Sequence, residues 1–280
     1  MLHYEEVVPP LPLREYIECY WTLISDFSLN EELSLPNGSA SLVFNFGPDY
    51  YRASSQTPDE RKKFGRCTLP HQGKSSVLIS QESPIRILGV RFKPYGMAPL
   101  FNISMANYTP PFIIHGKELT PFVKFIDKSF WQKENFKARI SILNDAFGQY
   151  LPTSSMPDGL VKKAVYIMIK NNGKIKITDL HEKLCVSKST LEKKFQEHVG
   201  LSPKILCNIL RFNCIVYNGQ QDPAPSLTEL SYRQGFFDQA HLVHNFRSFT
   251  GLPPGRFFKQ KNRLVKMLQQ SYENRTLKIY

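Results

Sequence analysis

Two short segments of the chain carry residues of the types that contact the edges of nucleic-acid bases. These residues are Lys188, Ser189, Glu192 and Lys193 in the first segment, and Gln239, Ala240, His241 and His244 in the second. Lysine donates to guanine O6 and N7, glutamine pairs with adenine, and glutamate accepts from cytosine N4. Lysine and histidine can equally donate to a phosphate, and a glutamate can repel one. Each residue alone is as compatible with a solvated helix face, so the prediction of base contacts rests on the group.

The two segments occupy corresponding places in a repeat of 51 residues. Leu191, Phe195, Gly200, Leu201 and Pro203 recur as Leu242, Phe246, Gly251, Leu252 and Pro254. Leucine and phenylalanine four positions apart share one helix face, so each segment predicts a helix with that face buried and the polar residues opposite. Ser187 and Asp238 can cap the two helices, and short helices are expected before them at 177–185 and 226–235. Each unit therefore predicts a helix-turn-helix, whose second helix lies in the major groove.

Helical solenoids also repeat such units, but they usually contain three or more of them. Here two units flank a unique predicted helix at 203–218. That arrangement predicts two reading helices on one side of a duplex, about one helical turn or roughly 34 Å apart. Arg211, Arg247 and Ser248 are predicted to contact phosphates, which set the register without reading sequence.

The charge of the chain is divided unevenly between its halves. The net charge is +12; residues 1–155 carry 16 Lys and Arg against 15 Asp and Glu, and residues 156–280 carry 20 against 9. Such asymmetry favours a polyanion-binding half beside a neutral half, although a basic solvated face is also common.

A length of 280 residues favours two domains. We predict a sensing or dimerisation domain at 1–152, a linker at 153–158, a DNA-binding domain at 159–262 and a basic tail at 263–280. Strand patterns at 41–46, 76–80 and 85–92 and helical patterns at 118–130 and 136–151 predict an α+β first domain of short strands, for which a cupin-like fold is one option. The second half predicts an all-α domain of about seven helices, the first at 159–172.

No metal, cofactor or membrane segment is expected from the residues. His3, His71 and His115 are isolated, and His241 with His244 lacks a third ligand. The five cysteines form no CxxC pair, which favours reduced thiols packed in the core of a cytoplasmic protein. No apolar run approaches the roughly 18 residues of a membrane span, and the first residues do not have the pattern of a signal peptide.

Residues 177–258 resemble the double helix-turn-helix domain of AraC/XylS-type transcription regulators. The matching phrases are LHEKLCVSKSTLEKKFQEHVGLSP, beginning at residue 180, and LSYRQGFFDQAHLVHNFRSFTGLPPGRF, beginning at residue 230. The second contains the strongest local signature of the family: GF, an acid two residues on, a histidine with an aliphatic neighbour, F and GxxP. His181 and Ser231 stand where the family usually has alanine, Lys193 where arginine is frequent, and Ile215 where alanine is usual.

The first half is similar to the N-terminal domains of an uncharacterised, cupin-related group of these regulators. The phrases are YIECYW at 16–21, LPNGSASLVFNFG at 35–47 and ILGVRFKPYG at 87–96. The resemblance implies sensing or dimerisation and names no ligand. Two interpretations stay open for Trp21, Phe44, Phe46, Arg91 and Tyr95: they line a small-molecule pocket, or they are core aromatics with one surface arginine.

The function expected is that of a sequence-specific, DNA-binding transcription regulator with no enzymatic activity. Double-stranded DNA is the expected partner, and a small-molecule effector and a homodimer are further candidates. One alternative is an architectural or nonspecific DNA-binding protein. Another is a DNA-repair enzyme in which Cys67, beside Arg66, is the nucleophile, because reactive cysteines lie in cationic, accessible sites.

Overall fold

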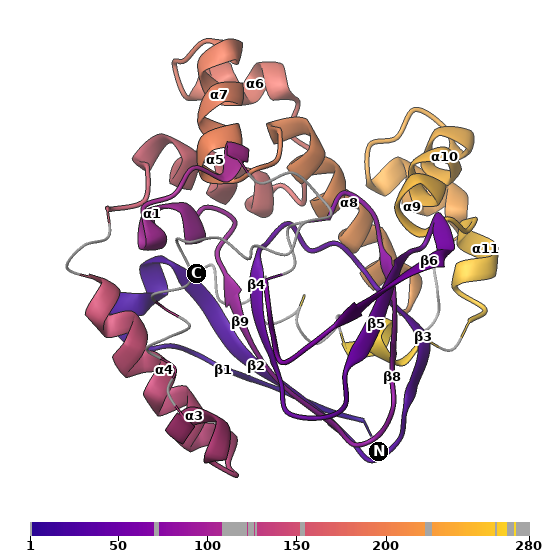
Figure 1. The fold of residues 1–280 in the computed structure, drawn as a ribbon. Helices are drawn as coiled ribbons and strands as arrows, with labels where there is room; N and C mark the ends of the chain where they lie inside the picture. Colours follow the sequence, from indigo (N-terminus) through magenta and orange to yellow (C-terminus); the bar gives the residue numbers. More distant parts are fainter. Residues whose placement is uncertain are drawn as a thin grey trace.

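The computed structural model describes residues 2–69, 73–107, 122, 126, 128–151, 155–221, 226–260, 262–267 and 272. Strands make up most of the first half, and the helices of the second half lie along one side of them (Figure 1). The chain is thus an α+β region followed by an all-α region, as the sequence predicted. The domain boundaries themselves remain predictions.

The described strands of the first half form two antiparallel sheets. The strands are β1 (His3–Val7), β2 (Ile17–Ser25), β3 (Leu29–Ser34), β4 (Ser41–Asn45), β5 (Tyr50–Ser54), β6 (Thr57–Phe64), β7 (Cys67–Thr68), β8 (Val77–Gln81) and β9 (Ile85–Phe92). Sheet A has the order β1-β2-β9-β4-β7, and sheet B has the order β3-β8-β5-β6. The predicted strands at 41–46, 76–80 and 85–92 are confirmed as β4, β8 and β9.

Most of the other strands carry no clear alternation of apolar and polar residues. β6 reads TPDERKKF and exposes every residue except its last. β2 reads IECYWTLIS and buries residues on both faces, because one face meets helices and the other faces sheet B. Apolar and polar residues alternate only along a strand that has one face in solvent and the other in the core. The sequence pattern therefore did not identify these strands.

Helices of the first half cover the outer face of sheet A. They are η1 (Leu11–Glu15), α1 (Met97–Phe101), η2 (Met105–Asn107), α3 (Lys128–Gln132) and α4 (Phe136–Tyr150). α4 confirms the helix predicted at 136–151, whereas most of the one predicted at 118–130 lies outside the described residues. Phe44 packs on Phe130 at 4.9 Å between ring centroids, and Phe46 packs on Trp131 at 5.2 Å. Phe44 and Phe46 are therefore core aromatics.

The described second half is helical. Its helices are α5 (Gly159–Lys170), α6 (Ile177–Lys183), α7 (Lys188–His198), α8 (Pro203–Gly219), α9 (Leu227–Arg233), α10 (Gln239–Thr250) and α11 (Pro254–Phe257), and residues 263–267 are also helical. These bounds differ from the predicted ones by a few residues at most. Pro203 stands in the first turn of α8, where its missing N–H leaves no partner unsatisfied.

The repeated leucine and phenylalanine pairs are buried around α8. Leu191, Phe195, Leu242 and Phe246 are each at most 1% exposed. Phe212 of α8 meets Phe246 at 5.1 Å and Phe249 at 4.6 Å between ring centroids. The helical core therefore consists of two similar units that pack on one central helix.

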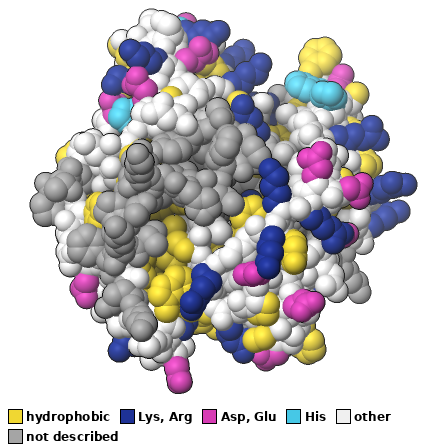
Figure 2. All heavy atoms as spheres, viewed as in Figure 1, with side chains coloured by type: hydrophobic (Ala, Val, Ile, Leu, Met, Phe, Trp, Pro, Cys, Tyr) yellow, Lys and Arg dark blue, Asp and Glu magenta, His cyan; other side chains and the backbone are white. Residues whose placement is uncertain are grey.

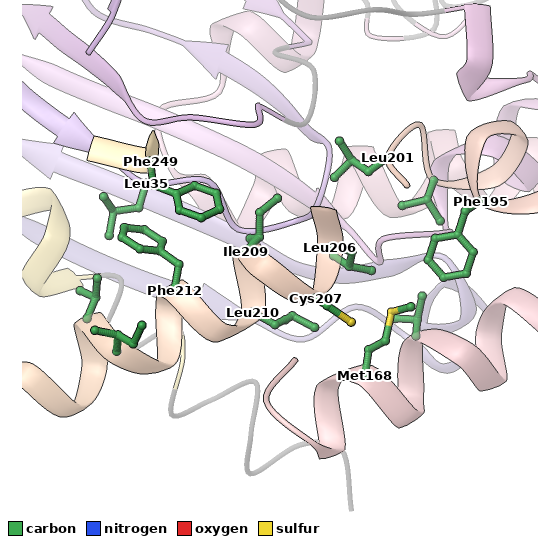
Figure 3. Close-up of a cluster of buried hydrophobic side chains, with 14 of the residues drawn as sticks. Leu35, Met168, Phe195, Leu201, Leu206, Cys207, Ile209, Leu210, Phe212 and Phe249 are labelled. Atoms are coloured by element: carbon green, nitrogen blue, oxygen red, sulfur yellow. The ribbon is translucent and has the colours of Figure 1, made fainter. Parts of the chain in front are cut away.

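The first half contributes side chains to this helical core. Leu33, Leu35 and Tyr95 belong to the same buried cluster, and Leu35 lies beside Phe212 and Phe249 (Figure 3). Tyr95 is thus not part of a pocket with Trp21, as one interpretation of the sequence had it. The two halves therefore bury apolar side chains against each other.

Hydrogen bonds join the halves at several separate places. Asn213 Nδ2 donates to Pro36 O at 3.0 Å, and Ser76 N donates to Phe249 O at 2.8 Å. In the segment predicted as a linker, Ser155 N donates to Pro99 O at 3.1 Å. The described end of this segment is therefore bound to the first half.

Among the described residues no single helix is long and apolar enough to cross a membrane. The bent pair α7 and α8 meets the length and composition criteria when its two helices are taken together.

Gly173 allows the turn between α5 and α6 to lie against α8. Its φ is +71°, and a Cβ at this position would stand 2.1 Å from the Cys207 carbonyl oxygen. Left-handed backbone costs an ordinary residue about 1–2 kcal/mol, and the overlap adds to that cost.

We expect Gly173→Ala to lower the free energy of unfolding by at least about 1–2 kcal/mol, because strain and overlap act together. Urea unfolding followed by circular dichroism measures the change. Gly159→Ala is the matched control, since a Cβ there meets nothing within 4 Å. Equal stability of the two variants would contradict the role given to Gly173.

Candidate nucleic-acid interface

The first unit consists of α6, a short turn and α7. Ser187 caps α7 as predicted, because its Oγ accepts from Thr190 N at 3.1 Å. Val199 and Leu201, which follow α7, are buried with its inner face. The four residues predicted to read bases all stand exposed on the outer side: Lys188, Ser189, Glu192 and Lys193.

Two of these exposed residues face one another along the helix. Lys188 Nζ lies 4.0 Å from Glu192 Oε1, and both side chains are at least half exposed. A surface pair of this kind contributes about 0–1 kcal/mol, so water or a ligand can separate it at little cost. Both charges therefore remain accessible to a partner.

The second unit consists of α9, a turn and α10. Asp238 caps α10 as predicted, with Oδ1 accepting from His241 N at 2.7 Å. The residues proposed to read bases again lie on the exposed side: Gln239, Ala240, His241 and His244. The His241 ring stands edge-on to Phe236 at 5.2 Å between centroids, which orients the imidazole at the start of the helix.

The three residues predicted to contact phosphates differ in their surroundings. Arg247 and Ser248 are exposed at the end of α10. Arg211 is half-buried; its Nη2 donates to Gly173 O at 3.3 Å, and its guanidinium lies 5.1 Å from the centre of the Phe236 ring. Burial lowers the pKa of Arg211. Arg211 thus braces the turn after α5, and the structure does not bring it together with the exposed pair.

The sequence patterns missed two exposed aromatic residues beside the second unit. Phe237 is 95% exposed and Tyr232 is 87% exposed. Phe237 directly precedes the capping Asp238, while its neighbour Phe236 is buried. The two successive phenylalanines, Phe236 and Phe237, could have predicted an exposed aromatic residue, because only one of two successive aromatics at a turn can enter the core.

The two units stand on the same side of the molecule. They are joined by α8 and lie above the sheets in the view of Figure 1. Lys and Arg side chains gather over both units (Figure 2), in agreement with the excess of basic residues after position 155. A basic face with two capped, polar helices is suited to bind the grooves and phosphates of a duplex.

The environment of Cys67 does not suit a nucleophile. Burial raises the pKa of the thiol to about 12, so the sulfur stays protonated at neutral pH. The neighbouring Arg66 guanidinium lies 4.6 Å from the centre of the Trp131 ring.

All five cysteines are free thiols; Cys185 is exposed, so the prediction of core packing is wrong for that residue. The part of the chain that the structure describes contains no cluster of three metal-ligating side chains.

Comparison with known families agrees with this arrangement. A family profile described as "Helix-turn-helix domain" matches residues 180–260, and one described as "Domain of unknown function (DUF6597)" matches residues 5–113. The chain thus carries two domains, a DUF6597 domain and, after it, an AraC-type DNA-binding helix-turn-helix domain of the kind found in transcription regulators.

Solved structures similar to this chain include those of ToxT and CuxR. ToxT from Vibrio cholerae shares 10% identity and a TM-score of 0.46, over 85% of this chain and 97% of ToxT. ToxT from Vibrio cholerae O395 bound to (E)-4-(8-methylnaphthalen-1-yl)but-3-enoic acid shares 10% identity and a TM-score of 0.44, over 92% and 97%. The AraC-like activator CuxR shares 9% identity and a TM-score of 0.26, over 70% and 89%. No curated protein matched the sequence.

Asp158 ties α7 to α5. Its Oδ1 accepts from Leu160 N and Val161 N, both at 3.0 Å, and its Oδ2 lies 2.5 Å from Lys194 Nζ on α7. Burial alone raises the pKa of Asp158. The hydrogen bonds from Lys194 and Val161, with the nearby positive charges, outweigh burial and lower the pKa.

A carboxylate whose pKa is lowered on folding stabilises the folded state at pH values above its unfolded pKa, which is about 4. That contribution disappears as the pH falls through the lowered pKa. We expect Asp158→Asn to lower the free energy of unfolding by about 0.5–1 kcal/mol at pH 7, because the pair is partly exposed. The difference in the free energy of unfolding between the variant and the native chain should shrink below about pH 4.

Urea unfolding at pH 7 and at pH 3 measures this dependence. Glu182→Gln, an exposed change on α6, is the control and should show no such trend. A difference for Asp158→Asn that is the same at both pH values would show that the charge of Asp158 is not what stabilises α5 and α7.

Proposed function

We propose that the chain is a sequence-specific regulator in which α7 and α10 read two successive segments of the major groove. The observation that carries this proposal is the equivalence of the two helices. Each is capped by its N-terminal side chain, buries a leucine–phenylalanine pair against the core and presents polar residues outward. With 17 residues, α8 is about 25 Å long and separates the units by a distance compatible with roughly one helical turn of DNA.

Base contacts are assigned by the chemistry of each exposed side chain. Lys188 and Lys193 donate to guanine O6 and N7, and Glu192 accepts from cytosine N4. Gln239 pairs with adenine, and Ser189, His241 and His244 donate or accept according to the base they meet. Ala240 and Phe237 offer apolar contact to thymine methyl groups. Arg247 and Ser248, which are exposed at the end of α10, are assigned to phosphates. Arg211, the third predicted phosphate contact, is half-buried and donates to Gly173 O instead.

Selection of the full chain against a random DNA library near 150 mM salt tests the proposal. We expect two short conserved blocks whose centres lie about 10 base pairs apart. A single block would mean that one unit reads bases and the other only binds phosphates. No enrichment, together with a steep dependence of binding on salt, would instead favour an architectural DNA-binding protein.

Single substitutions separate base reading from phosphate binding. We expect Lys193→Ala to relax the preference in one block and Gln239→Ala in the other, each costing about 1–3 kcal/mol of binding to the selected site. Fluorescence anisotropy on matched and scrambled duplexes measures both effects. Lys163→Ala, an exposed change on α5, is the control. A variant that weakens binding to every sequence equally marks a phosphate contact.

The proposal includes modulation by the first half, in a cytoplasmic protein that responds to a small molecule or to dimerisation. Gln56 Nε2 donates to Ser248 O at 2.9 Å, so the β5–β6 turn is bonded to the end of α10. Arg263, beyond α11, donates from Nε to Glu32 Oε1 at 2.6 Å and from its backbone N to Glu32 Oε2 at 2.7 Å. A change in the sheets can therefore be transmitted to the second unit. Sedimentation of the DNA complex tells whether one or two chains bind.

We expect Glu32→Gln to raise the affinity for the selected DNA site by about 3–10-fold. A neutral amide accepts more weakly from Arg263, so the second unit would adjust to the duplex more freely. Glu31→Gln is the matched control, since Glu31 pairs with Arg61 inside the first half. Anisotropy measures affinity, and hydrogen exchange of residues 262–267 reports loosening. Faster exchange with unchanged affinity would show that this contact does not regulate DNA binding.

A further inference from the structure

Arg211 is the middle residue of α8, the helix that lies between the two helix-turn-helix units in the view of Figure 1. Its side chain is half-buried, whereas Arg247 and Ser248 at the end of α10 are exposed. The groups that enclose the Arg211 guanidinium therefore say more about its role than its charge does.

On one side, Arg211 holds the turn between α5 and α6. Its Nη2 donates to Gly173 O at 3.3 Å. The turn lies directly on α8 there, because a Cβ at Gly173 would stand 2.1 Å from the Cys207 carbonyl oxygen and 2.9 Å from Arg211 N. Since α6 begins at Ile177, shortly after this turn, the contact fixes where the first unit starts.

On the other side, Arg211 contacts the turn between α9 and α10. Its guanidinium lies 5.1 Å from the centre of the buried Phe236 ring, which is within the range of a cation–π interaction. The Phe236 ring in turn stands 5.2 Å from the His241 ring at the start of α10. One side chain thus contacts both the turn that leads into the first unit and the turn inside the second.

A second contact joins the same region of the two units. Lys174, which directly follows Gly173, donates from Nζ to Arg233 O at 3.2 Å. Arg233 is the last residue of α9, where carbonyl groups have no partner within the helix. We call the contacts made by Arg211 and Lys174 the inter-unit contact. It connects the start of the first unit with the turn of the second.

The angle between the two reading helices needs a contact of this kind. The leucine–phenylalanine pairs determine which face of each helix points outward, but apolar burial is non-directional and does not by itself fix one unit relative to the other. Hydrogen bonds and cation–π contacts are directional. A partly buried charge can also serve to specify one arrangement rather than to add stability.

We propose that Arg211 and Lys174 are positioning residues that set the distance and angle between α7 and α10, and with them the number of base pairs between the two DNA blocks. The inference rests on the proposed function, because a spacing has meaning only if both helices read DNA. A firmly joined pair of reading helices rejects a site with the wrong spacing, whereas a loosely joined pair accepts several.

Duplexes that carry the two selected blocks at different spacings test the proposal. Insertion of two base pairs shifts the second block by about 7 Å and rotates it by about 70°, since a helical turn of about 34 Å holds about 10 base pairs. We expect the native chain to bind this duplex about tenfold more weakly than the selected one. Arg211→Met and Lys174→Met should each reduce that ratio to about threefold, because the units can then adjust to the longer spacing. Fluorescence anisotropy measures the ratio.

Two controls separate positioning from other roles. Arg211→Lys should retain most of the native ratio, since lysine keeps a positive charge near Phe236 and can still donate to Gly173 O. Lys163→Met, an exposed change on α5, is the matched control for Lys174→Met. The base preference within each block should stay the same in all variants. An unchanged ratio in Arg211→Met would overturn the proposal, and so would equal weakening at every spacing, which marks a phosphate contact.

A distance measurement without DNA keeps this proposal distinct from the proposed function. Spin labels at Gln196→Cys on α7 and Tyr232→Cys on α9, both exposed, report the distance between the units by double electron–electron resonance. Cys185→Ser removes the exposed native thiol from every sample. We expect Arg211→Met to broaden the distribution of distances in the full chain. Lys174→Met, a surface change, gives the same test if thermal unfolding shows that Arg211→Met does not fold.

The outcomes of the two experiments differ for the two proposals. Equally narrow distance distributions in the native chain and the variants would overturn the inter-unit contact, whatever the DNA selection returns. Broader distributions together with a selected site of one block would keep the inter-unit contact, but would refute its role in DNA spacing along with the two-block reading. Broader distributions with an unchanged spacing ratio would leave the proposed function intact and overturn the assignment of spacing to Arg211 and Lys174.

Discussion

Burial of two equivalent leucine–phenylalanine pairs around α8 is the interaction on which the rest of the structure depends. Leu191 with Phe195 and Leu242 with Phe246 belong to the same buried cluster as the residues of α8 and anchor α7 and α10 to it. Fixing the inner face of each helix also fixes which residues face outward. Because close-packed interiors tolerate little displacement, the orientation of the two polar faces follows from this core.

The same core extends into the first half of the chain. Leu35 lies against Phe212 and Phe249, and Asn213 donates to the Pro36 carbonyl oxygen. The second helix-turn-helix unit is further bonded to the β5–β6 turn and to Ser76. The DNA-binding half is thus held by the sheets through contacts that a change in the sheets can alter, which is the physical requirement for one half to influence the other.

The two halves of the chain differ in where their charged side chains lie. The excess of basic residues lies over the helices, where exposed charges attract phosphates at long range. The sheets instead enclose two arginines: Arg91 is neutralised by Glu6 and Glu18, and Arg52 lines an apolar cavity. A charge at a solvated surface acts at long range, whereas a buried, paired charge acts mainly on its own partners.

The sequence by itself determined the local part of this protein. The 51-residue repeat, the capping residues Ser187 and Asp238, the helix at Pro203 and the outward positions of α7 and α10 all follow from interactions within a few residues of one another. Only the tertiary structure decided the rest. The burial of Arg91, the facing position of Arg52, the space that Gly89 leaves for Trp21 and the contact of Leu264 with the sheets bring together residues from separate strands and segments. Two strands show why. β6 pairs with β5 just before it, but its residues are nearly all exposed, so no apolar alternation marks it as a strand. β2 pairs with β9, which lies far along the chain, and no pattern within the segment records that partner.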